Sequence, residues 1–237
     1  VMVRAAGVTL KDVTVKGDLI IADGVGEGDI TLDSVTVEGR TVVRGGGENS
    51  IHIIGNSNVQ NIIIARVDGQ VRVYAEDGTE IGTVIVDGSD DVIIEGDFKS
   101  VTVLAEDVTV VATNATITNA TIEGKDSIIV VGSGSTIDTI AVNGENATIT
   151  ANAGAKVNDV VINANGATVA GAGTVTNVAA NADDATVNTV GTVVKAAEGT
   201  SGVKAGDDAV APGTEETVGL PPSTGGGGGG GPQTVAV

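Results

Sequence analysis

The sequence contains no cysteine and no tryptophan, and only 1% of its 237 residues are aromatic. The absence of cysteine excludes disulfide bonds, thiolate metal sites and thiol catalysis. With one tyrosine and one phenylalanine, the chain offers few ring faces on which a sugar can stack. Carbohydrate recognition by aromatic stacking is therefore disfavoured.

Positive charge is also scarce, with 12 Lys and Arg against 31 Asp and Glu and a net charge of -19. A field of this sign repels phosphate, so nucleic acid is a poor candidate partner. Apolar runs of the roughly 20 residues that a membrane span needs are missing, so no membrane insertion is expected.

What the sequence does have is a short repeat rich in Val and Ile, which favours β-strands over helices. Residues 7–17 and 29–39 match at an offset of 22, and apolar residues at i, i+3 and i+5 recur nine times between Leu10 and Ala180. A unit of this length is typical of solenoids. The position before the second apolar residue is short and polar in all nine copies, which predicts a tight corner between strands. These residues are Asp12, Ser34, Asn61, Thr83, Ser100, Asn119, Thr139, Asp159 and Asn177.

A second apolar ladder follows the first in each repeat, and its outer residues are expected to face inward. Its members are Val71/Val73, Val92/Ile94, Val108/Val110, Ile128/Val130, Ala147/Ile149, Ala167/Val169 and Ala185/Val187. The two ladders predict an all-β fold, a right-handed parallel β-helix of about nine to ten coils. We expect the β-helix over residues 1–205. An acidic and then Pro/Ser/Thr/Gly-rich linker is expected over 206–231, and a disordered tail or the start of another module over 232–237.

Candidates for chemistry are few, and no catalytic residue is predicted. His52 is the only histidine and is expected at a surface position. Some β-helix enzymes cleave acidic polysaccharides with a Ca²⁺ site and an arginine base, and Arg72 is predicted to point outward. The loop with Asp23, Glu27 and Asp29 has oxygen ligands for a cation such as Ca²⁺, although a solvated acidic turn is the favoured interpretation. No other cofactor is expected.

One outward column contains aliphatic residues that indicate a lateral contact surface for another domain or another rod. Scattered exposed aliphatic residues are normal in soluble proteins, so a solvated face remains the alternative. The column is predicted as Thr14, Thr36, Ile63, Ile85, Thr102, Thr121, Ala141, Val161 and Ala179, with Ile63, Ile85 and Val161 as the candidate contact residues. A second outward column is rich in threonine, which keeps ice binding open as a minor alternative, but Ile129 is expected to interrupt it. Its threonines are Thr109, Thr148, Thr168 and Thr186.

Residues 4–21, 26–32 and 44–53 resemble the β-helix regions of large surface-layer-associated proteins, with S-layer homology domains, of Gram-positive, Paenibacillus-like bacteria. The likeness covers about residues 3–100. It implies an extracellular location at the bacterial cell surface, with other surface-protein domains or cell-wall components as partners, and it offers no catalytic residues to transfer.

The function expected from these observations is a non-catalytic structural, display or adhesion module, a stiff acidic rod. The alternative is a polysaccharide-active or Ca²⁺-dependent carbohydrate-binding β-helix of the lyase type. A third interpretation is an adhesin that uses the lateral column, either for a protein partner or for self-association.

Overall fold

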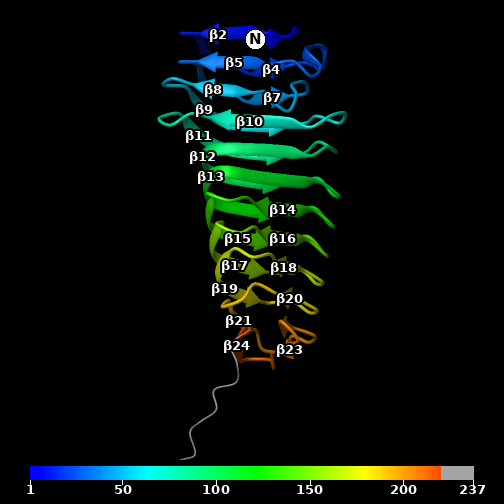
Figure 1. Cartoon of the computed structure of the whole chain (residues 1–237). Coiled ribbons are helices and arrows are strands. Elements are labelled where there is room, and N and C mark those ends of the chain that lie inside the picture. The colour runs from blue at the N-terminus through cyan, green and yellow to red at the C-terminus, as the bar shows by residue number, and fades with distance from the viewer. Residues whose placement is uncertain (220–237) are drawn as a thin grey trace, which may run out of the picture.

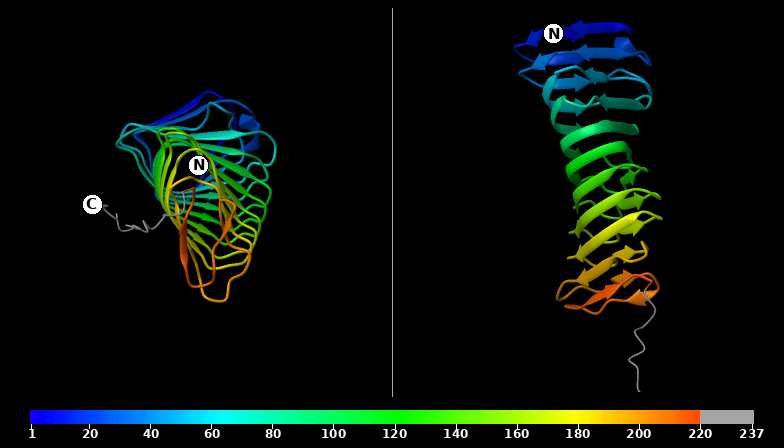
Figure 2. Two further views of the ribbon diagram at one scale, coloured as in Figure 1. Left: turned by 60° about the horizontal axis from the view of Figure 1, so that its bottom comes forward. Right: turned by 60° about the vertical axis from the view of Figure 1, so that its left-hand side comes forward.

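The computed structural model describes residues 1–219, which form a solenoid of about ten stacked turns (Figure 1). The predicted parallel β-helix is confirmed. Successive coils follow one another along a single axis, from the blue N-terminal coils to the orange C-terminal ones (Figure 2). Within residues 1–219 the only helical element is a single 3-10 turn, Asp23–Val25.

The first and last coils are built from short strands, and the middle coils contain the longer ones. The short strands are β1 (Met2–Val3), β2 (Val8–Lys11), β3 (Thr14–Val15), β4 (Leu19–Ile21), β5 (Ile30–Asp33), β6 (Thr36–Val37), β7 (Thr41–Val43) and β8 (His52–Ile54). They are followed by β9 (Asn58–Ile64), β10 (Val71–Ala75), β11 (Glu80–Val86), β12 (Val92–Val103), β13 (Thr109–Ile122), β14 (Ile128–Val131), β15 (Thr136–Val142), β16 (Thr148–Ala151), β17 (Lys156–Ile162), β18 (Thr168–Ala170) and β19 (Thr174–Ala180). The last are β20 (Thr186–Val187), β21 (Val193–Ala196), β22 (Lys204–Ala205), β23 (Asp208–Ala209) and β24 (Glu215–Thr217).

The core consists of aliphatic side chains that lie directly over one another in the parallel register. One such column is Ile62, Val84, Val101, Ala120, Ile140, Val160, Val178 and Val194. Each member is at most 2% exposed. At about 0.8 kcal/mol per buried CH₂, this stacking offsets the entropy cost of ordering each coil. Alanines such as Ala167 and Ala185 hold inward positions in the later coils, where less apolar area is buried.

The short polar positions were predicted to lie between strands, but seven of the nine lie within a single strand. Only Asp12 (φ 51°) and Ser34 (φ 56°) adopt left-handed angles there. The other seven positions lie within continuous strands, where two successive residues face outward, as Gln60 and Asn61 do between buried Val59 and Ile62. The chain therefore changes direction by a bulge-like bend in the strand, which needs no left-handed residue.

Left-handed turns instead form a column at a different point of the coil. Its members are Asp107, Asp126, Asn146, Gly166, Asp184 and Gly202, with φ between 55° and 75°. Asn and Asp tolerate this region because their short side chains bond locally, and glycine has no steric penalty. At Gly166 a Cβ would lie 2.4 Å from Oδ1 of Asn146, so close stacking as well as backbone angle favours glycine.

The second ladder is confirmed except at one coil. Ile128 and Val130, predicted to face inward, are half-exposed, and Ser127 and Ile129 are buried instead. The inward serine is tolerated because its Oγ donates to the carbonyl of Ala105 at 2.8 Å and accepts from the Val108 N–H at 3.3 Å. The threonine column is consequently interrupted by Ile128, not by Ile129.

Residues 206–219 were predicted as the start of the linker, and this is wrong. Strand β24 pairs antiparallel with β21, and β23 pairs antiparallel with β22. Val210 and Val218 are 5% and 3% exposed, so this segment packs against the last coil and closes it. Residues 220–231 of the predicted linker and the 232–237 segment lie outside the described residues.

Candidate functional site

Arginines of the following coils form ion pairs with carboxylates of the acidic loop that was considered as a cation site. Asp23 Oδ2 lies 3.1 Å from Arg44 Nη2, and Glu27 pairs with the guanidinium of Arg66. Asp29 is exposed and its carbonyl accepts from Gly7 N–H. Within residues 1–219 no three Asp, Glu or His side chains converge as metal ligands. A cation at this loop would have to compete with two guanidinium groups.

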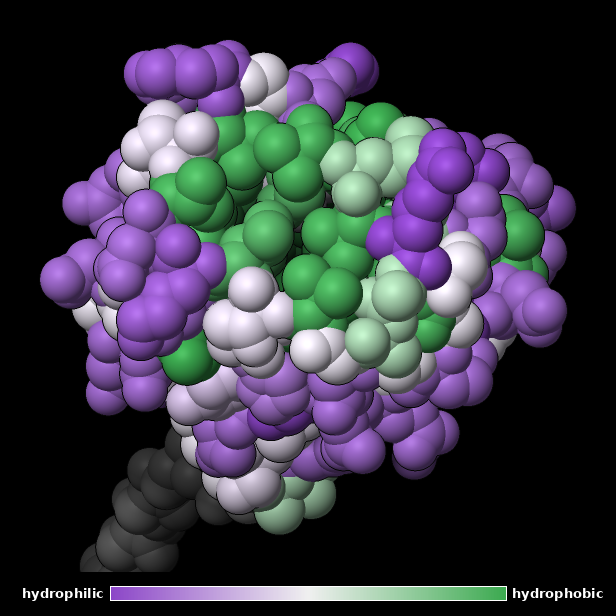
Figure 3. Space-filling view, turned by 90° about the horizontal axis from the view of Figure 1, so that it is seen from above, coloured by the Kyte–Doolittle hydropathy of each residue, from purple (hydrophilic) through white to green (hydrophobic). Residues whose placement is uncertain are grey.

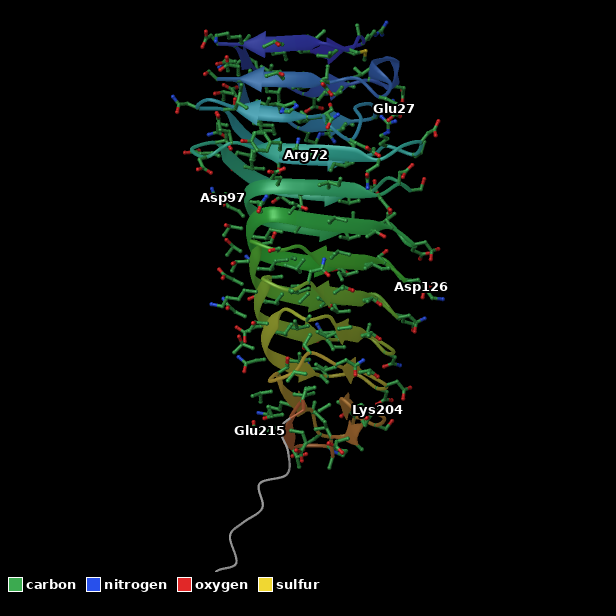
Figure 4. All side chains as sticks on the ribbon, viewed as in Figure 1. Glu27, Arg72, Asp97, Asp126, Lys204 and Glu215 are labelled. Carbon is green, nitrogen blue, oxygen red and sulfur yellow. The ribbon has the colours of Figure 1, made fainter. Side chains whose placement is uncertain are left out.

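Arg66 joins the loops of three successive coils. Its side chain is 5% exposed, and Nη1 donates to the carbonyls of Gly26 (2.8 Å) and Gly46 while Nη2 contacts Glu27. Glu27 is labelled at the edge of the early coils in Figure 4. Its buried Nε has no partner among the described residues. A hollow of about 310 Å³ beside it is lined by Asp23, Gly26, Glu27, Arg44, Arg66, Val67 and Asp68. Three carboxylates and two guanidiniums nearly cancel there, so the hollow has little net preference for ions of either sign.

The single histidine and the single tyrosine meet on an outward face. His52 on β8 is paired in register with Tyr74 on β10, and their rings lie 5.9 Å apart in an edge-to-face arrangement. Arg72 lies over the Tyr74 ring at 5.1 Å, and its Nε donates to Glu95 at 3.0 Å. The carboxylate and the ring face both stabilise a charged guanidinium. Arg72 points outward as predicted, and its guanidinium is held between Glu95 and the Tyr74 ring.

The lateral column contains Ile63 and Ile85 next to each other, as predicted. Its members nearer the N-terminus are not the predicted ones. The register places Val42, Ile20 and Met2 above Ile63. Thr14 and Thr36 belong instead to the column of Asn58. The five apolar members are half-exposed or, for Met2, 48% exposed. Val161 lies in the same column, separated from Ile85 by Thr102, Thr121 and Ala141.

Opposite charges alternate along the axis in the first coils. Lys11 pairs with Asp33 at 2.6 Å, and Arg40 pairs with Asp18 at 2.7 Å. The hydrogen bond from Lys11 lowers the pKa of Asp33, and that of Lys11 is raised in turn. Hydrogen bonds from the Arg40 side chain and backbone likewise lower the pKa of Asp18.

Amide ladders replace ion pairs in the later coils. Asn143 donates to Glu123 at 2.8 Å, Asn163 donates to Asn143 at 2.9 Å, and Asn181 donates to Asn163 at 3.0 Å. Shorter ladders join Asp126 to Asn146, Asp138 to Asn158 and Asp159 to Asn177. Such side-chain ladders run parallel to the backbone hydrogen bonds and reinforce the stacking. Sequence reasoning missed them, although Asn143 and Asn163 recur at the repeat spacing.

The chain matches no protein-family model, no curated protein and no solved structure. No helix within residues 1–219 is long and apolar enough to cross a membrane.

Proposed function

We propose that this chain is a non-catalytic structural or display module of an extracellular bacterial surface protein, a stiff acidic rod that holds neighbouring domains apart. The observation that supports this role is that outward polar side chains form hydrogen bonds between successive coils. Carboxylates and amides such as Asp33, Glu123 and Asn163 are used in contacts between successive coils. They do not converge on one reaction centre.

The ladders give the proposed rod its stiffness. Bending the axis would stretch backbone hydrogen bonds on one side together with the side-chain bonds that run beside them. With about ten turns and about 4.8 Å per turn, the rod is roughly 48 Å long. Its high net negative charge favours solubility and repels other acidic surfaces. Other surface-protein domains and cell-wall components are the partners implied by the sequence resemblance.

The competing proposal is a polysaccharide-active or Ca²⁺-dependent carbohydrate-binding β-helix. The hollow that contains Asp23, Glu27 and Asp68 is the place where it can be tested, although Arg44 and Arg66 line the same hollow. If Ca²⁺ bound there in the native state, it would raise the melting temperature in proportion to its occupancy.

A Ca²⁺ titration followed by thermal melting distinguishes the two proposals. The rod proposal predicts the same melting temperature with 10 mM Ca²⁺ as with 10 mM Mg²⁺, and no unsaturated product from uronate polymers. A Ca²⁺-specific rise that Glu27→Gln removes, or release of unsaturated sugar that Arg72→Gln removes, would favour the competing proposal. A matched control is Glu48→Gln, an exposed carboxylate outside the hollow.

A further inference from the structure

One outward face of the rod is uncharged in an otherwise acidic molecule. The lateral column described above has no charged side chain from Ile20 to Ala179, and every member in this range is half-exposed. These members are Ile20, Val42, Ile63, Ile85, Thr102, Thr121, Ala141, Val161 and Ala179. Seen down the axis, the rim of the first coils is mostly hydrophilic, and hydrophobic residues reach it in few places (Figure 3). A second acidic rod can approach along this column without placing carboxylates against carboxylates.

A second column, called the flanking column, runs beside the lateral column, two residues further along each coil. Its members are Ala22, Arg44, Ala65, Asp87, Leu104 and Glu123, and the backbone N–H of each donates to the coil before. Arg44 lies one coil before Ala65 and Asp87 one coil after it, and both charged side chains are exposed. Leu104, one coil further, is 44% exposed. Positive charge thus lies on one side of Ala65 and negative charge on the other.

This charge pattern is complementary to itself when it is reversed. A two-fold axis perpendicular to the rod, at the level of Ile63, places each coil before Ile63 in one copy against the matching coil after it in the other. Val42 then faces Ile85 of the second copy, and Ile63 faces its own equivalent. In the flanking column Arg44 faces Asp87 of the second copy, and symmetry makes this contact twice.

A parallel arrangement of two copies lacks this complementarity. A two-fold axis along the rod brings the flanking column against the outward residues on the other side of the lateral column, within the same coil. Arg44 would then face Arg40, which lies two residues before Val42. In the antiparallel arrangement Arg40 faces Thr83 instead. Like-charge contacts are costly when water is excluded, so the charges favour the antiparallel pair.

We propose that two copies of this chain associate side by side and antiparallel through the lateral column, centred on Ile63. The contact extends two coils to each side, where Ala22 meets Leu104. At about 4.8 Å per coil and about 3.3 Å per residue, the strip covers roughly 24 by 13 Å of each copy. Interfaces of this size are weak and transient, so the dimer is expected to form at about 0.1–1 mM protein.

Antiparallel pairing would join rods from two facing surfaces, a consequence that rests on the proposed display role. Rods anchored on one surface all point the same way, so their antiparallel partners belong to the opposite surface. Many weak contacts between two such surfaces add up by multivalency. The dimer itself depends on this face of the chain alone, and it can fail while the spacer role stands.

The test is sedimentation velocity and light scattering of the full 237-residue chain up to about 1 mM, at 20 and 500 mM NaCl. The mass is expected to rise toward that of a dimer and no further, and added salt is expected to weaken the association. R44D and D87R each bring like charges face to face and are expected to weaken association at least fivefold. R44D/D87R restores opposite charges in both contacts and is expected to associate like the wild type.

The matched controls are K156D and D97R, which make the same charge changes at exposed positions beyond the bend in the strands. Both are expected to associate like the wild type, and circular dichroism melts confirm that each variant is folded. A spin label at Ala141→Cys, four coils from Ile63, reports the orientation. The antiparallel dimer places the two labels eight coils apart, about 38 Å, whereas a parallel dimer places them within about 20 Å.

The proposal is overturned if the wild type stays monomeric at 1 mM, or if its mass passes beyond the dimer. It is also overturned if R44D/D87R associates as weakly as R44D, or if the two controls weaken association as much as R44D and D87R do. The shorter distance between the labels would contradict the antiparallel orientation.

Discussion

The Ser57 hydroxyl oxygen accepts a 2.9 Å hydrogen bond from the backbone N–H of Val35, one coil earlier. Ser127 and Ser135 are placed in the same way beneath Val108 and Ala115. In all three cases the donor follows a residue with left-handed angles: Ser34, Asp107 and Asn114. A left-handed residue turns the next N–H out of the regular ladder, and the buried serine of the following coil satisfies it.

Replacing one of these buried serines by alanine is expected to destabilise the fold more than the same replacement of an exposed serine. Ser135→Ala leaves the Ala115 N–H, 3.0 Å from Oγ, without its partner. It also removes the 3.1 Å bond to the Ala112 carbonyl, which keeps its bond from the Gly132 N–H. Two buried groups lose a bond, so a loss of about 1–3 kcal/mol of unfolding free energy is expected. Urea denaturation followed by far-UV circular dichroism measures it. The exposed Ser133→Ala is the control, expected within about 0.5 kcal/mol of the wild type. Equal effects at the two positions would contradict the role of the buried hydroxyl.

The Arg66 side chain is predicted to contribute to the folding stability of the N-terminal half by joining its loops. Arg66→Met removes the donors to Gly26 and Gly46 while keeping much of the apolar stem. We expect a loss of about 1–3 kcal/mol, because the buried Gly46 carbonyl loses this donor. The Gly26 carbonyl keeps its bond from the Gly46 N–H. Arg44→Met, which breaks only the exposed pair with Asp23, is expected to cost under about 1 kcal/mol. If both changes cost the same in urea denaturation, Arg66 does not hold the loops together.

The amide ladder yields a test at the surface. Asn163→Ala removes the bond to Asn143 and the bond from Asn181. An expected loss of about 0.5–1.5 kcal/mol follows from typical net values for intramolecular hydrogen bonds. Amide hydrogen exchange by mass spectrometry is expected to show faster exchange in β17 and its two neighbouring coils. The exposed Asn152→Ala, outside these ladders, serves as the control. Unchanged exchange in Asn163→Ala would mean that the ladder adds nothing to the backbone bonds.

Acid is predicted to weaken the first coils through Asp33. The bond from Lys11 lowers its folded-state pKa, so the contribution to stability is present above the unfolded value of about 3.9. It is lost as pH falls through the lower folded value. The same bond raises the pKa of Lys11, so Lys11 stays protonated across this acid range and the bond is lost through Asp33. The melting temperature of Asp33→Asn is expected to lie below that of the wild type at pH 7 and to converge with it near pH 2. A difference that persists at pH 2, or a similar effect of Asp29→Asn, would refute this linkage.

The sequence predicted the stacked core because branched aliphatic residues recur at a fixed spacing and only inward positions require them. Ser127 was missed because an inward serine looks polar until the N–H that it satisfies is known. The upper part of the lateral column was misread for a related reason. Thr36 and Val42 lie on different faces of one coil, and only the register shows that Val42 precedes Ile63. The closure by β23 and β24 depends on antiparallel contacts that the repeat pattern does not encode.

Stiffness along the axis is measured most directly by the distance between two spin labels in one outward column. The chain has no cysteine, so Val42→Cys with Lys195→Cys places labels eight coils apart in an unbroken register. Val42→Cys with Thr121→Cys spans four coils. At about 4.8 Å per coil, the expected backbone separations are roughly 38 and 19 Å. Double electron–electron resonance in dilute protein is predicted to give one narrow distance distribution for each pair. The two mean distances are expected to stand in a ratio of two to one. A broad distribution for the eight-coil pair, or one that shifts with salt, would contradict the rigid spacer.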